Sequence, residues 1–124
     1  MSEPRNPDDT PKDDLVAPTV LVMDGSGLVV EWSPQAEQIF GWRRADAIGR
    51  RLSALIIPER HRGAHEAGLK RFLAGGPGAL LDRAIEIFAI DREGREFNVE
   101  IRITAKKVGD DYRFATSARR LGAS

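Results

Sequence analysis

Cysteine is absent from the 124 residues of this chain. Disulfides, thiolate metal sites and cysteine nucleophiles are therefore excluded, and nothing indicates an oxidising compartment. Long apolar runs are absent too, since none approaches the roughly 20 residues that a helix needs to span a bilayer. The acidic, proline-bearing start also lacks the basic and apolar regions of a signal peptide. We therefore expect a cytoplasmic protein that has no membrane partner.

A net charge is lacking as well, because 19 basic residues balance 19 acidic residues. Such a chain has no general electrostatic attraction to nucleic acid or to an anionic membrane surface. The charges are unevenly placed, and the first 14 residues contain more acidic than basic side chains. The small basic excess in the rest of the chain is too weak to indicate a nucleic-acid partner.

The length fits one compact domain with a single core. Its start, "MSEPRNPDDTPKDD", has three prolines and almost no apolar side chains, so it cannot bury enough surface to offset the entropy of ordering. We expect a flexible segment over residues 1–17, a folded domain over residues 18–120, and a short C-terminal tail over residues 121–124.

Two β-rich runs open the folded part, at residues 19–23 and 28–32, and turn residues separate them. This pattern predicts a hairpin. Ser33 then supplies a helix cap and Pro34 suits the first helical position, so we expect a short helix that ends near Gly41.

Two further helical turns are predicted on either side of Gly49, and a longer helix runs from Pro58 to about Ala74 before "GGPG" stops it. Three strand-like runs follow, at residues 83–92, 96–107 and 112–121.

The middle run has the clearest alternation of period two, because its apolar positions Phe97, Val99, Ile101 and Ile103 alternate with polar ones. Strands and helices are segregated along the chain. We therefore predict the α+β class, with an antiparallel sheet whose one apolar face the helices cover.

This order of elements resembles the PAS domain family over roughly residues 18–120. The resemblance rests on "DGSGLVVEWSPQAEQIFGWRRADAIGRRLSALIIPERHRGAHEAGLKRFLAGG" followed by "IEIFAIDREGREFNVEIRI". It implies a five-stranded antiparallel sheet, with short helices and one longer helix enclosing a cavity. Such domains sense a ligand or mediate dimerisation, and they usually accompany an output such as a histidine kinase. We therefore expect a homodimer that acts on a signalling partner.

Both histidines, His61 and His65, lie four residues apart in the longer predicted helix. At about 100° per residue, the stripe that contains His65 also holds Leu69, Phe72 and Leu73. We expect His65 to point into the domain and His61 to face solvent. One interpretation is a half-buried histidine that is hydrogen-bonded to backbone or water.

The alternative is a haem ligand, because "RHRGAHEAGLKRF" resembles the proximal helix of the haem-binding PAS oxygen sensors, with His65 at the position of their iron ligand. Their distal arginine falls on Ile85, which cannot donate a hydrogen bond to bound oxygen. The resemblance implies a cofactor or ligand site made of His65, Leu69, Phe72, Leu81, Ile85, Val99 and Ile101, in which His65 is a metal ligand only if haem is bound.

Other cofactors have less support. Flavin PAS domains of the light-sensing type need a cysteine, which is absent, and non-covalent flavin stays an alternative without support. Trp32 and Trp42 are better explained by packing at the two ends of the first helix. A domain that binds no cofactor is a further alternative.

Surface chemistry explains the remaining charged groups. The basic cluster Arg43, Arg44, Arg50 and Arg51 is interpreted as a solvated face. Glu66 and Lys70, four residues apart, are predicted to be ordinary surface residues of their helix, and Glu37 has no partner four residues further on.

Three functions remain open. The first is a non-catalytic PAS sensory and dimerisation module that binds a small ligand or a partner, and the second is a haem-based gas sensor. The third is a small cavity enzyme, which would need an acid or base with an orienting partner in the cavity. The cavity-facing positions of the middle strand carry no such group, so this third function has the least support.

Overall fold

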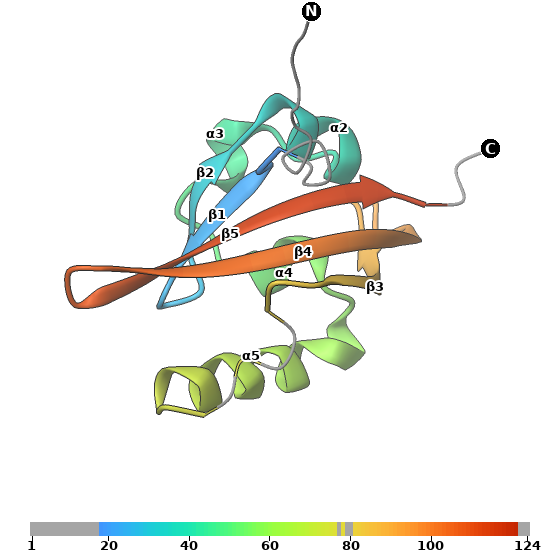
Figure 1. Ribbon diagram of the computed structural model, residues 1–124. Helices are drawn as coiled ribbons and strands as arrows, with labels where there is room; N and C mark the ends of the chain where they lie inside the picture. The colour runs from blue at the N-terminus through green and yellow to red at the C-terminus, as the bar shows by residue number, and fades with distance from the viewer. Residues whose placement is uncertain (1–17, 77, 79–80, 122–124) are drawn as a thin grey trace, which may run out of the picture.

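The computed structural model describes residues 18–76, 78 and 81–121 (Figure 1). The predicted flexible segment 1–17 lies outside the described residues, as do residues 122–124 of the predicted tail. The division of the chain into these segments therefore stays a prediction.

The described residues form one antiparallel sheet of five strands in the order β2-β1-β5-β4-β3. The strands are β1 (Leu21–Asp24), β2 (Val29–Trp32), β3 (Ala84–Ile90), β4 (Glu96–Val108) and β5 (Asp111–Arg120). The helices are α2 (Pro34–Phe40), α3 (Arg44–Ala47), α4 (Leu52–Ile56) and α5 (Glu59–Leu73). Both the α+β class and the order of the elements are confirmed.

Local sequence chemistry sets the ends of the first elements. In the β1–β2 turn, the Asp24 carboxylate accepts hydrogen bonds from the backbone N–H groups of Ser26 (2.9 Å) and Leu28 (3.1 Å). The Ser33 hydroxyl caps α2 by accepting from the Ala36 N–H at 3.2 Å, and Gly41 ends the helix with φ at 81°. These ends agree with the predicted ones because they depend on single residues.

One side-chain contact connects α2 with α3. The carboxylate of Glu37 accepts a hydrogen bond of 2.7 Å from the backbone N–H of Arg44, at the first residue of α3. Glu37 therefore satisfies the start of a helix that has no side-chain cap of its own.

The core lies between the inner face of the sheet and α2, α3 and α4. Phe97, Val99 and Ile101 of β4 are buried there, as the alternation predicted, and Ile103 is half-buried. The tryptophans pack as predicted, since the indole N–H of Trp32 donates to the Trp42 carbonyl at 2.9 Å, and that of Trp42 donates to Leu55 at 3.0 Å.

The longest helix, α5, runs across one side of the sheet, next to α4 (Figure 1). Its residues are at most half-buried, and His61 is exposed as predicted. Leu73 is 41% exposed, so the prediction that it belongs to the buried stripe is wrong. Within the described part of the chain, no helix is long and apolar enough to cross a membrane.

Candidate functional site

The candidate site lies between α5 and the inner face of β3, β4 and β5. On the helix, Leu69 and Phe72 pack against the hydrophobic core while remaining half-buried. On the sheet, Val99 and Ile101 are buried and Ile85 is half-buried. Of the seven predicted site residues, two therefore belong to the hydrophobic core and three more pack against it.

Leu81 joins this group from the segment before β3. Its side chain is half-buried, and its backbone forms an isolated bridge with Ile103 of β4. The Leu81 side chain and the Phe72 ring both flank Gly78 closely enough to crowd any side chain placed there. Leu81 thus lies next to the C-terminal end of α5.

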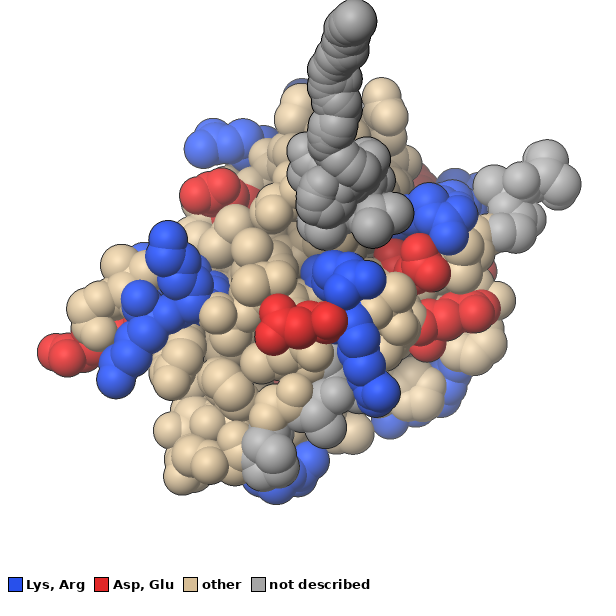
Figure 2. Space-filling view, viewed as in Figure 1, with Lys and Arg blue, Asp and Glu red and all other residues tan. Residues whose placement is uncertain are grey.

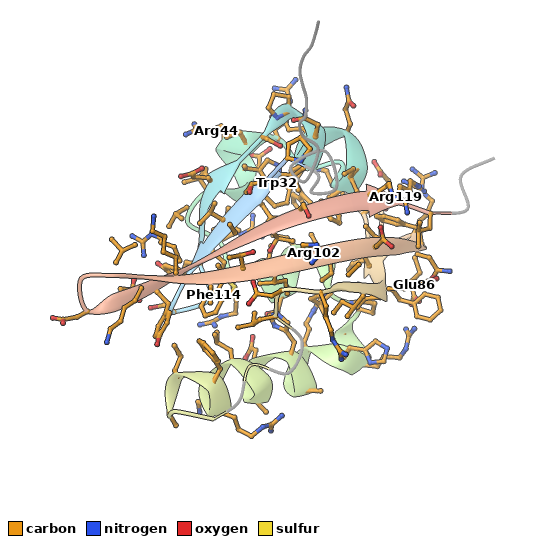
Figure 3. The ribbon with its side chains drawn as sticks, viewed as in Figure 1. Trp32, Arg44, Glu86, Arg102, Phe114 and Arg119 are labelled. Carbon is orange, nitrogen blue, oxygen red and sulfur yellow. The ribbon has the colours of Figure 1, made fainter. Side chains whose placement is uncertain are left out.

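Three aromatic rings hold that end of the helix against the sheet. The Phe72 ring lies 5.2 Å from the Tyr112 ring and 5.7 Å from the Phe114 ring, edge-on to both. Tyr112 and Phe114 stack on each other along β5 at 5.9 Å. Figure 3 shows Phe114 on the side of β5 that faces α5. Edge-to-face pairs of this kind add to the stabilisation from buried area.

Polar contacts hold the other half of α5. The carboxylate of Glu66 accepts a hydrogen bond of 2.7 Å from the hydroxyl of Ser53, which is 1% exposed. This hydrogen bond is the main reason why the pKa of Glu66 lies below its usual value. Glu66 lies on the helix surface as predicted, with a 45% exposed side chain, and it also connects α5 to α4 through this hydrogen bond.

Arginine side chains complete the attachment. Arg62 donates to the backbone carbonyls of Ser53 (3.0 Å) and Ile57 (2.8 Å). Arg60 forms a two-pronged ion pair with Glu96 at the start of β4, with distances of 2.6 and 2.8 Å. The position of α5 consequently does not depend on Phe72 alone.

His65 lies in the half of α5 that carries the polar contacts, directly before Glu66. Its Nδ1 atom is buried and has no hydrogen-bond partner among the described residues. Burial lowers the pKa of the imidazole, and the neighbouring charge of Glu66 opposes this only in part. The imidazole is therefore neutral near pH 7, and its buried Nδ1 atom is left without a hydrogen-bond partner among the described residues.

The wall that faces α5 is hydrocarbon. Ile85, Ile87 and Ile103 are half-buried on the inner face of the sheet, although α5 lies over that side. No group of histidine, aspartate and glutamate among the described residues is arranged to hold a metal ion on its own. Such a wall suits apolar ligand surface, with His65 as the nearby polar group.

Sequence reasoning missed Tyr112 and Ser53 as parts of this site. Tyr112 begins a predicted strand-like run, but periodicity does not show which helix side chain it meets. Ser53 has no distinguishing pattern, because its role comes from a partner 13 residues away.

A hollow lies on another part of the molecule. It has a volume of about 320 Å³ and is lined by Thr19, Val20, Leu21, Glu31, Trp32, Ser33 and Arg44. Figure 3 shows Trp32 and Arg44 well away from Phe114 and α5. None of the predicted site residues lines it.

The charged surface has no single sign. Figure 2 shows basic and acidic side chains interspersed with uncharged ones on the visible face. All four arginines of the predicted basic cluster are exposed, with Arg50 over the Trp42 ring at 5.5 Å and Arg51 3.9 Å from Glu66. The solvated-face interpretation agrees with these exposures.

Comparison with known proteins gives a consistent result. A family profile described as "PAS fold" matches residues 14–111. An uncharacterized protein of Azorhizobium caulinodans is 33% identical over 100 residues, which cover 81% of this chain and 14% of that protein. Sensor protein FixL of Bradyrhizobium diazoefficiens is 26% identical over 102 residues, which cover 82% of this chain and 20% of that protein.

Solved structures show the same fold. The RpfR quorum-sensing receptor PAS domain of Cronobacter turicensis, in complex with C12:0, has a TM-score of 0.62 at 14% identity. The match covers 83% of this chain and 92% of that one. The chain spans only a small part of the two longer relatives, so their whole-protein activities do not transfer to it directly.

Proposed function

This chain belongs to the PAS domain family, and from that premise we propose that it is the non-catalytic sensory module of a signalling protein. Its ligand site is the region between α5 and the inner face of β3, β4 and β5. Ligand binding there changes how α5 packs on the sheet, and β5 passes the change onward.

The observation that carries this proposal is the buried Nδ1 atom of His65, which has no partner among the described residues. A buried polar group without a partner costs roughly 1–3 kcal/mol. A ligand with one polar group recovers that cost by hydrogen bonding to the imidazole. A purely structural histidine would be expected to have its partner within the protein.

The lining points to the class of ligand. The predicted site residues other than His65 are hydrocarbon, and His65 is the one polar group among them, so the best fit is an amphipathic molecule with one polar end and an apolar body. The complex of the RpfR domain with C12:0 supports a ligand of this kind in a domain of the same fold.

Calorimetric titration with a panel of straight-chain carboxylic acids and alcohols tests this proposal. We expect saturable binding, and we expect His65→Leu to weaken it about tenfold or more, through loss of one buried hydrogen bond. His61→Leu is the matched control, because His61 is an exposed histidine of the same helix. If no member of the panel saturates the protein, or if both variants bind like the parent, the amphipathic-ligand proposal is wrong.

Haem is the second candidate ligand, and the same imidazole favours it. A neutral, partly buried histidine beside apolar side chains is suited to haem iron, so the residues fit the group. His65 would hold the iron, and haem would supply a centre that binds diatomic gases. Ile85, Val99 and Ile101 would exclude water without offering a hydrogen-bond donor.

An absorption spectrum before and after adding haem distinguishes the two candidates. A haem-binding domain would give a Soret band that shifts with carbon monoxide and disappears in His65→Ala, whereas His61→Ala would keep it. The absence of saturable haem binding would remove this candidate and leave the amphipathic ligand.

We also propose that the module works as a homodimer alongside a histidine kinase or similar output in the cytoplasm. PAS domains often dimerise, and Phe88, on the outward side of β3, is 51% exposed. Figure 3 shows the charged side chains Glu86, Arg102 and Arg119 on this part of the sheet.

Sedimentation analysis tests the dimer. We expect concentration-dependent self-association that Phe88→Glu weakens, while Val108→Glu, at a similarly exposed strand position, leaves it unchanged. A parent protein that stays monomeric at high concentration would contradict the homodimer.

A further inference from the structure

Phe72, Tyr112 and Phe114 form an aromatic cluster at one end of the ligand region, and we propose that Phe72 is the end wall that limits the length of the ligand. This inference rests on the proposed amphipathic ligand. It adds a specificity-determining residue, whereas the proposed function identifies only the polar contact.

Helix geometry sets the spacing between the two ends of the region. Phe72 follows His65 by seven residues, so the two side chains lie about 20° apart around α5 and about 10 Å apart along its axis. Phe72 packs against the core of the domain. A ligand whose polar end meets His65 therefore extends its apolar body along the helix toward the Phe72 ring.

The aromatic cluster closes the region at that point. The Phe72 ring contacts both rings of β5, at 5.2 and 5.7 Å, and thus spans the distance between the helix and the sheet. Beyond it, Leu81 and the Phe72 ring crowd Gly78. An apolar chain that reaches this end meets packed side chains and cannot continue past them.

Removing the Phe72 ring should open the end without dismantling either layer. Tyr112 and Phe114 stack on each other within β5, so their contact does not need Phe72. The helix keeps its hydrogen bond from Ser53 to Glu66 and its ion pair between Arg60 and Glu96. The substitution therefore changes the length of the region more than its position.

The test is a titration of straight-chain fatty acids, from hexanoic to tetradecanoic acid, into the parent chain, Phe72→Ala and Phe72→Leu. We expect the parent to prefer a medium chain length, and Phe72→Ala to shift the preference toward longer acids. Tetradecanoic acid should gain about tenfold or more in affinity relative to hexanoic acid, since each added methylene in an apolar site is worth a factor of this order. Phe72→Leu should give a smaller shift.

Leu73→Ala is the matched control, because Leu73 is the next residue on α5 and is 41% exposed. It should leave the length preference unchanged, and circular dichroism should confirm that every variant is folded. If the parent binds these acids and Phe72→Ala keeps the same preference, the end-wall inference is overturned while the proposed function stands. If the parent binds none of them, the amphipathic-ligand proposal fails, and this inference fails with it.

Discussion

At the scale of single residues, Gly41 and Gly63 differ in whether the structure needs a glycine at that position. Gly41 has φ at 81°, in the left-handed region, and a Cβ placed there would lie 3.3 Å from the Cβ of Arg92. Gly63 lies inside α5, and a Cβ placed there would meet nothing within 4 Å. Gly41 is thus needed for its backbone conformation, whereas Gly63 only makes its helix less stable.

We therefore predict effects of opposite sign for the two alanine substitutions. Gly41→Ala should lower the free energy of unfolding by about 1–2 kcal/mol, the usual cost of a left-handed side chain. Gly63→Ala should raise it by about 0.5–1 kcal/mol, because alanine has the higher helix propensity. Urea denaturation measures both, and a stabilising Gly41→Ala would contradict the structure of this turn.

Asp91 should make the stability of the domain depend on pH. Burial disfavours its ionised form, but hydrogen bonds from the Arg95 backbone (3.0 Å), the Arg95 side chain (3.2 Å) and the Glu93 backbone (2.9 Å) outweigh this and lower the pKa of the carboxyl. A lowered folded-state pKa means that the unfolded chain binds more protons near pH 4. The resulting stability is present above about pH 4 and is lost as the pH falls through the folded-state pKa.

Asp91→Asn tests this prediction. The variant should be less stable at pH 7 by about 1–3 kcal/mol, because it weakens hydrogen bonds in a buried turn. It should also lose less of its remaining stability between pH 5 and pH 3 than the parent, measured by the urea midpoint. Asp46→Asn, at an exposed position, is the control, and an identical acid response of Asp91→Asn and the parent would contradict the assignment.

At the scale of elements, the cap of α2 connects a sequence signal directly to stability. The Ser33 hydroxyl accepts from the Ala36 N–H, which would otherwise lack a partner at the helix start. Ser33→Ala should therefore cost about 1 kcal/mol. Ser33→Asn should restore the stability, since asparagine caps equally well. Thermal denaturation measures both, and equal destabilisation by the two variants would argue against the cap.

The ends of the elements could be predicted because each depends on neighbouring residues. Ser33, Pro34 and Gly41 define α2, and the alternation from Phe97 onward defines the inner face of β4. The class of fold followed from these segments and their order. Local chemistry was sufficient for this part of the structure.

The site could be predicted only in part, because its contacts join segments far apart in the chain. Helical phase placed His65 with Leu69 and Phe72, but it also placed Leu73 there, which the structure shows to be exposed. The Ser53–Glu66 hydrogen bond and the Phe72–Tyr112 contact have no local signal. Nor does periodicity show whether a buried nitrogen has a partner, which is the feature on which the proposed function rests.

At the scale of the whole molecule, the attachment of α5 determines how the domain should respond to a ligand. The helix has no buried residue, whereas β4 and β5 contribute several to the core. Local opening is easiest where few side chains are buried. We expect the amides of α5 to exchange with deuterium faster than those of β4 and β5 in the ligand-free protein.

A ligand that contacts both α5 and the sheet should slow the amide exchange of α5, and so reduce its difference from β4 and β5. It should also stabilise the whole domain. At 100 times its Kd, such a ligand raises the free energy of unfolding by about 2.7 kcal/mol, and each kcal/mol raises the Tm of a domain of this size by about 4–8 °C. Decanoic acid should therefore raise the Tm of the parent and slow exchange in α5, and His65→Leu should reduce both effects. A rise in Tm with unchanged exchange in α5 would place the ligand elsewhere on the molecule, since a ligand bound to this helix must slow its opening.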